Sequence, residues 1–197
     1  KKTLHAYTSD QSIADGMTVP IHVDPRLVSF QLDKDAVDEA FEALTQAEDL
    51  DEDSAEVLVR RGSRVDVVFA NPARADAVCV DIVDHFYSTI DPLGMKAQVV
   101  AFDRAACVAY YERLTHLLEQ RHAEGHPLDE AAVVMHVTNG KHEDEEWAQH
   151  RRSEAEEADL LRRFRTHGDP LKFLVVTSRL GTGFNAPIEA AMYLDKP

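Results

Sequence analysis

The sequence predicts an α/β protein built on a parallel β-sheet. Short apolar segments alternate with longer amphipathic helical segments through the second half of the chain. The apolar segments are hydrophobic at successive positions, so both faces of the strands that they form are expected to be buried. This alternation is typical of βαβ units, in which helices cover both faces of a parallel sheet.

The strands and helices follow one another in a regular order. Strands are expected at residues 97–102, 131–137, 173–177 and 191–194. A helix between the first two strands is predicted by apolar residues at helical spacing, namely Cys107, Tyr110, Tyr111, Leu114 and Leu118. A second helix, between the next two strands, is predicted in the same way by Trp147, Ala155, Ala158, Leu161 and Phe164.

The first half of the chain has a weaker pattern. Residues 1–30 are expected to be mostly loop, and the short apolar segment 19–23 is expected to be an edge strand because Pro20 interrupts it. An amphipathic helix is predicted over residues 36–47. Asn71 and Pro72 predict the start of another helix, with Asn71 as the N-cap, and residues 91–94 end that helix.

Charge and composition exclude several classes of protein. The chain of 197 residues carries 21 basic and 36 acidic side chains, a net charge of −15, and residues 31–60 hold eleven of the acids against two bases. This balance excludes a basic nucleic-acid-binding module. Two cysteines without a C-x-x-C motif indicate neither a disulfide framework nor a zinc cluster. No signal peptide or membrane-spanning segment is evident, so a cytoplasmic fragment of a longer protein is expected.

Three loops are candidates for ligand binding, because ligands of open parallel sheets bind beyond the carboxyl ends of the strands. They are residues 102–104, 138–141 and 177–187, and the third combines glycines, hydroxyl groups and Arg179. Residues 181–186 fit the G-x-G-x-x-[GA] dinucleotide fingerprint formally, but Pro187 follows at once and no partner acid comes later. A connecting loop with turn-forming glycines is the alternative interpretation.

The last 25 residues resemble a known family. The strand at 173–176 leads into Leu180-Gly181-Thr182-Gly183-Phe184-Asn185-Ala186-Pro187, and Tyr193-Leu194-Asp195-Lys196-Pro197 follows. This segment resembles the helicase motif V region of type I restriction enzyme R (HsdR) subunits, which has Thr-Gly-Phe-Asp-Ala-Pro and then Tyr-x-Asp-Lys-Pro. Residues 14–21 are similar to the Asp-Gly-x-Thr-Val-Pro-Ile segment that follows the first motor domain of those subunits, and residues 97–114 to their motif IV strand and helix.

The resemblance implies a superfamily two motor, an ATP-driven double-stranded DNA translocase that is joined to a nuclease domain and works with methyltransferase (M) and specificity (S) subunits. It assigns residues 1–94 to the end of the first motor domain and a mainly helical acidic connector. It assigns residues 95–197 to a second RecA-like domain, a three-layer parallel sheet with flanking helices, truncated before motif VI. ATP and Mg²⁺ are expected in the full-length parent and not on this fragment alone.

The resemblance also implies site residues. By position, Arg104, Thr177, Thr182 and Gly183 would face DNA, while Gly181, Gly183 and Asn185 would couple the loop to ATP. Asn185 stands where the family usually has Asp, which weakens the case for direct contact with the ribose. No catalytic or metal-binding residue is assigned. Two alternatives stay open, another superfamily two helicase or repair motor and a Rossmann-like nucleotide-binding module.

The first prediction concerns catalysis. The sequence contains no G-x-x-x-x-G-K-[ST] motif, so no loop is available to hold the phosphates of a nucleotide as the Walker A loop does. The fragment alone is therefore expected to show no ATPase activity, with or without DNA. Phosphate release measured on the purified protein tests this, and turnover that persists through repurification would contradict it.

Overall fold

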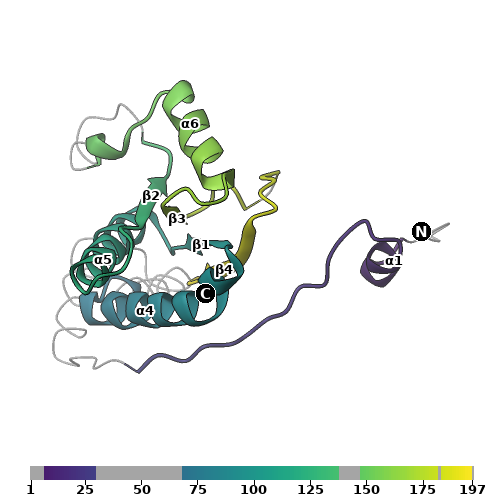
Figure 1. Cartoon of the computed structure of the whole chain (residues 1–197), viewed down its shortest axis with the longest axis horizontal. Helices are drawn as coiled ribbons and strands as arrows, with labels where there is room; N and C mark the ends of the chain where they lie inside the picture. The colour runs from purple at the N-terminus through teal and green to yellow at the C-terminus, as the bar shows by residue number, and fades with distance from the viewer. Residues whose placement is uncertain (1–6, 30–67, 138–146, 182, 197) are drawn as a thin grey trace, which may run out of the picture.

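A computed structural model describes residues 7–29, 68–137, 147–181 and 183–196 (Figure 1). The acidic segment 31–60, the helix predicted at 36–47, the loop 138–141 and Thr182 lie outside the described residues. The described part contains four parallel strands in the order β2-β3-β1-β4. They are β1 (Lys96–Val100), β2 (Glu130–Val134), β3 (Leu171–Val176) and β4 (Glu189–Leu194).

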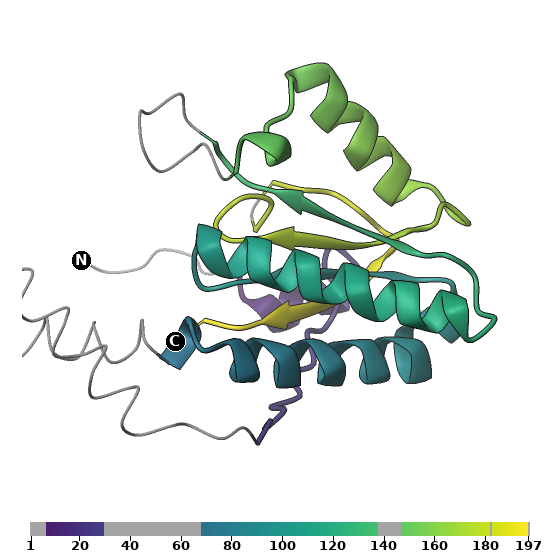
Figure 2. The same cartoon turned by 90° about the vertical axis from the view of Figure 1, so that its left-hand side faces the viewer.

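Helices cover the sheet on both sides (Figure 2). One face packs against α4 (Pro72–His85) and α5 (Arg104–Ala123), and the other packs against α6 (Glu154–Arg165). A π-helical turn (Phe86–Ile90) and a 3-10 turn (Asp91–Leu93) lead from α4 to β1. The predicted α/β class with a helix-covered parallel sheet is confirmed, and the layers are those expected of a RecA-like domain.

The handedness of the connections explains which face each one covers. The connection from β1 to β2 passes over β3 in one direction across the sheet and contains α5. The connections from β2 to β3 and from β3 to β4 run in the opposite direction. Because parallel crossovers are right-handed, these two must lie on the other face. Accordingly, Leu180 and Phe184, from the connection between β3 and β4, pack in the same apolar cluster as α6.

Alternate residues of the strands form two apolar cores. Val99 and Phe173 belong to the core on the α4 and α5 face, where Phe86 lies 4.4 Å from Phe173 between ring centroids. Leu174 and Val176 point to the α6 face and pack with Phe164. Both faces of the central strands are therefore buried, which is why their sequences are apolar at successive positions.

Side-chain caps fix the helix starts. Asn71 caps α4, as predicted, with its side-chain oxygen accepting from the Arg74 amide at 3.1 Å. Ser153 caps α6 through a capping box with Glu156, so the helix begins at Glu154. The prediction that Trp147 lies on this helix is therefore wrong. Trp147 precedes a separate 3-10 turn, Ala148–His150.

The N-terminal region differs from its prediction in two respects. A short helix, α1 (Ser9–Ala14), forms where loop was expected, because Thr8 and Gln11 make a capping box. Residues 19–23 are extended, but no strand is assigned to them in the described structure, so the predicted edge strand is not found. Farther along, Arg26 forms a bidentate ion pair with Asp81 of α4, with both N–O distances at 2.7 Å.

Helix α4 belongs to the same core as the sheet. Cys79 and Ile82 of α4 are buried in the cluster that contains Val99 and Phe173. The predicted boundary between residues 94 and 95 stays a prediction, and the packing of α4 shows that residues on both sides of it share one core. None of the helices in the described ranges is long and apolar enough to cross a membrane.

Gln98 offers a test of this core. Its side chain is 0% exposed at the centre of β1, and among the described residues neither its amide nitrogen nor its amide oxygen has a hydrogen-bond partner. Since an unpaired buried polar group is unfavourable, Gln98→Met should raise the free energy of unfolding by about 1–2 kcal/mol. Urea denaturation measures this change. The exposed Gln149→Met is the matched control and should change stability by less than about 0.5 kcal/mol, and a destabilised Gln98→Met protein would contradict the prediction.

Candidate functional site

The carboxyl ends of β1 and β3 form the candidate site. These two strands are neighbours, but the chain leaves β1 toward the α5 face and leaves β3 toward the α6 face. Divergence of adjacent connections creates a crevice at such a switch point, where ligands of open α/β sheets bind. The Thr177 hydroxyl donates to the Phe102 carbonyl oxygen at 3.4 Å, so the loops after the two strands are in contact.

Arg104 lies at this edge, as predicted from sequence. It is the first residue of α5, and Asp103 caps the helix by accepting from the Ala106 amide at 2.7 Å. The Arg104 guanidinium carbon lies 4.8 Å from the centre of the Trp147 ring, a cation–π contact. Trp147 is half-buried against the core and supports the arginine. The predicted loop 102–104 is therefore a cap and a helix start.

The loop after β3 is anchored to α6 on both sides of its glycines. The Arg179 guanidinium pairs with both carboxylate oxygens of Glu157, at 2.7 and 2.6 Å. The Arg165 Nε donates to the backbone oxygen of Asn185 at 2.8 Å, and its guanidinium lies over the Phe184 ring at 4.7 Å. Asn185 thus contributes a backbone oxygen to the anchor, and its side chain is exposed.

The tip of this loop has unusual backbone geometry. Gly183 has φ of +73°, and it is exposed. A Cβ atom built on Gly183 would meet no atom within 4 Å, so its conformation and not close packing requires glycine. Leu180 also has a positive φ, 63°, which is strained for a branched side chain. Gly181 is exposed at a normal φ.

Sequence reasoning missed a buried charged cluster beside this edge. Asp195 follows β4, and each of its carboxylate oxygens accepts a hydrogen bond from the Arg74 guanidinium, one of them at 2.7 Å. The Tyr110 hydroxyl also donates to Asp195. The hydrogen bond to Asp195 raises the Arg74 pKa, and burial raises the Tyr110 pKa. Asp195 belonged to the matched sequence motif, but nothing local in the sequence pointed to Arg74.

Neither the two cysteines nor the two histidines that lie four residues apart, His122 and His126, form a reactive or metal-binding group among the described residues. Burial raises the pKa of both cysteine thiols, Cys79 and Cys107, to about 12, so neither is a nucleophile at neutral pH. His122 and His126 are exposed, and the His122 ring bonds the His126 carbonyl oxygen at 2.9 Å. No group of three or more potential metal ligands occurs among the residues that the structure describes.

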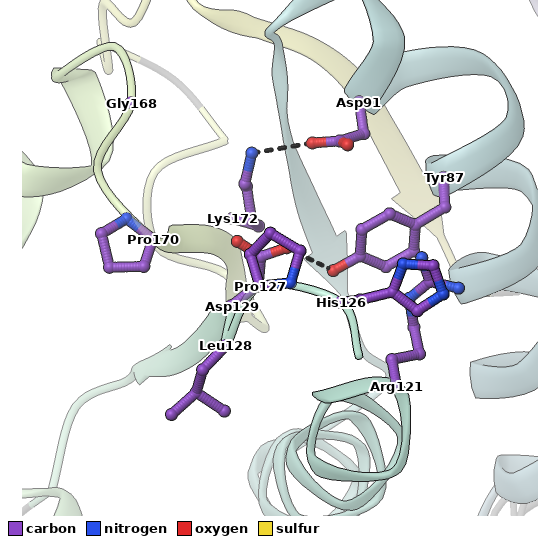
Figure 3. Close-up of a pocket in the computed structure, with 10 residues that line it drawn as sticks. All are labelled: Tyr87, Asp91, Arg121, His126, Pro127, Leu128, Asp129, Gly168, Pro170 and Lys172. Carbon is purple, nitrogen blue, oxygen red and sulfur yellow. Dashed lines mark hydrogen bonds and ion pairs between the residues drawn. The ribbon is translucent and has the colours of Figure 1, made fainter. Parts of the chain in front are cut away.

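A cavity of about 310 Å³ lies at the opposite, amino edge of the sheet (Figure 3). Its polar groups bond one another, with Tyr87 donating to Asp129 at 2.8 Å and Lys172 pairing with Asp91 at 2.7 Å. Arg121 stacks on the Tyr87 ring at 3.6 Å. These contacts tie the residue before β2 and the start of β3 to the two turns after α4. The cavity is therefore a structural feature, remote from the carboxyl edge.

Sequence comparison finds that the chain is similar to subunits of restriction enzymes. The type I restriction enzyme HindI endonuclease subunit of Haemophilus influenzae is 30% identical over 193 residues, 97% of this chain. The chain is similar to type I restriction endonuclease subunits. Two proteins of Methanocaldococcus jannaschii, named as the MjaIXP and MjaVIIP endonuclease subunits of type I restriction enzymes, are each 27% identical over 98% of the chain.

These comparisons confirm the resemblance seen in the sequence. The chain spans only 17%, 18% and 20% of the length of the three relatives, so it corresponds to one segment of each of those subunits. No protein-family model matches the chain.

Gly183 provides a prediction for the loop. A valine there would have to adopt a φ near +73°, which residues other than glycine and, less often, asparagine or aspartate rarely do. Gly183→Val should lower the free energy of unfolding by about 1–2 kcal/mol, and Gly183→Asn should lower it less. Chemical denaturation measures both. Gly181→Val is the control because that residue is exposed at a normal φ, and equal losses at the two glycines would contradict the assignment.

Proposed function

We propose that the chain is a segment of the ATP-dependent, DNA-translocating R subunit of a type I restriction–modification endonuclease. In this proposal its carboxyl edge contacts the DNA backbone and couples that contact to ATP, without holding a complete active site. The observation that carries the proposal is the match of 97% of the chain to an endonuclease subunit, together with the position of Arg104 and Thr177 at one edge.

The chemistry of this edge suits a phosphate backbone. Arg104 offers a charged donor, Thr177 a hydroxyl, and the exposed loop at Gly181 and Gly183 offers backbone amides with no side chain in the way. Such groups bind phosphate oxygens without reading base sequence. A motor that moves along DNA needs contacts of this kind, because it must bind equally well at every step. Thr182 is assigned to the same surface by sequence position and lies outside the described residues.

In our proposal, ATP and Mg²⁺ bind outside the described residues. Arg179 of the loop is paired with Glu157, and Arg165 of α6 donates to the backbone oxygen of Asn185. No cluster of potential metal ligands is found in the described ranges. The sequence also lacks a phosphate-binding loop. In our proposal the rest of the full-length subunit holds the nucleotide and its metal ion. Gly181, Gly183 and Asn185 transmit the state of that site to the DNA-facing edge.

The anchors of the loop suggest how this coupling would work. Because Arg179 and Phe184 fasten the loop to α6 on either side of its glycines, movement of the loop requires either movement of α6 or rotation at the glycines. The M and S subunits of the complex are the proposed protein partners, by analogy with the type I enzymes to which the relatives belong. Double-stranded DNA is the proposed substrate.

DNA binding by the protein tests this proposal. A net charge of −15 opposes DNA everywhere except at local basic sites, so binding should be weak and should fall steeply with salt. Arg104→Glu should weaken binding by roughly tenfold at low salt, measured by fluorescence anisotropy with duplex DNA. The control is Arg162→Glu in the last turn of α6, where the exposed arginine pairs with Asp159.

Two outcomes would contradict the proposal. One is tight binding at physiological salt that Arg104→Glu leaves unchanged. The other is no salt-dependent binding at any ionic strength. In the full-length subunit assembled with its M and S partners, Arg104→Glu should also slow DNA translocation in a triplex-displacement assay, while Arg162→Glu should not.

A further inference from the structure

We propose that Lys196 is a phosphate-binding cation of the carboxyl edge, and that Arg74 positions it by occupying the neighbouring carboxylate. The inference rests on the proposed function, because it names a further DNA-contacting residue at the same edge. Neither residue was among the sites assigned from sequence.

The backbone places Lys196 beside the switch point. The chain leaves β4 next to β1, and the Asp195 amide donates to the Val100 carbonyl oxygen at 2.9 Å. From this position the Lys196 side chain reaches across the end of β1. Its Nζ lies 3.5 Å from the Thr177 hydroxyl oxygen. The ammonium group therefore stands over the crevice between the β1 and β3 loops.

The charge of Lys196 is available to a ligand. The side chain is exposed, and within the described part of the chain no carboxylate forms an ion pair with it. The nearest acid in sequence, Asp195, is engaged by the Arg74 guanidinium and the Tyr110 hydroxyl. The side chains of Arg74 and Asp195 are only 11% and 15% exposed, so this pair is largely shielded from solvent. Asp195 is held away from the lysine that follows it.

Arg74 also supports the other side of the crevice. Its guanidinium carbon lies 4.2 Å from the centre of the Phe69 ring, and Phe69 stacks on Phe102 with centroids 4.6 Å apart. The Phe102 carbonyl oxygen accepts from Thr177, the residue that Lys196 contacts. The contacts form a closed ring around the carboxyl ends of β1, β3 and β4. Arg74 thus fixes both the loop that carries Arg104 and the residue that precedes Lys196.

The two cations have different roles because of their surroundings. A lysine ammonium is a compact charge on a flexible stem and suits a phosphate oxygen that changes position as DNA moves. The Arg74 guanidinium is buried, and its donors go to Asp195 and Tyr110. Arg74 is therefore a positioning residue that does not touch DNA, and Lys196 makes the contact.

The test is the salt dependence of duplex DNA binding by the protein. Each phosphate contact contributes about 0.9 to the slope of log affinity against log salt concentration. Lys196→Gln should reduce the slope by about that amount and weaken binding several-fold at low salt. Lys196→Arg should keep the slope. Arg162→Gln removes the same charge from α6, outside this edge, and should leave the slope unchanged.

Arg74→Gln should reduce the salt slope of DNA binding as much as Lys196→Gln does. The double variant with both substitutions should show no further reduction of the slope or of the affinity. If Arg74→Gln does not fold, as judged by circular dichroism, Tyr110→Phe removes one donor to Asp195 and should produce a smaller loss in the same direction. Additive losses in the double variant would overturn the positioning role. A Lys196→Gln protein that binds like Arg162→Gln, while Arg104→Glu binds weakly, would overturn the inference and leave the proposed function standing. Absence of DNA binding by the unaltered protein would overturn both.

Discussion

Both faces of the parallel sheet must be covered, and this constraint decides the shape of the candidate site. The connection from β3 to β4 has to cross β1 on the α6 face, yet it contains no helix in the described structure. The loop itself must therefore supply the cover, through Leu180, Phe184 and Ala186. The loop that seals this core thus begins at the edge where a ligand would bind.

This double role explains why the loop combines buried apolar side chains with exposed glycines. Its apolar side chains are fixed in the core, and Arg179 and Arg165 tie its two ends to α6. The strained backbone of Leu180 is tolerated because its side chain is packed there. The exposed Gly183, at a positive φ, lies between these two fixed ends. A ligand can therefore contact the loop between its anchors without displacing the side chains that seal the core.

Local patterns in the sequence were sufficient for the strands but not for the site. The four strands lie within a few residues of the predicted segments, because a strand buried on both faces needs a continuous apolar run. The rule for the carboxyl ends of parallel strands then selected the loops after β1 and β3, which are in contact in the structure. Two helix starts were missed although their capping boxes, Thr8 with Gln11 and Ser153 with Glu156, are visible in the sequence.

The bond between Arg74 and Asp195 was beyond sequence reasoning for a different reason. The two residues are 121 positions apart, and neither residue type is unusual in its own surroundings. Only the packing of α4 against the sheet brings them together, and no periodic pattern in the sequence predicts such a long-range contact. The partner of a buried charge is fixed by tertiary structure, so a single sequence cannot identify it.

The extended segment near the N-terminus has a consequence for the behaviour of the protein in solution. Apolar residues alternate along it, and all are strongly exposed: Met17 by 72%, Val19 by 80%, Ile21 by 88% and Val23 by 86%. An extended segment with one apolar side is a template for pairing with another copy, and like charge is what keeps such copies apart. With a pI of about 5.0, acidification removes that repulsion. Aggregation near pH 5 would then start from this segment while the folded core is still intact.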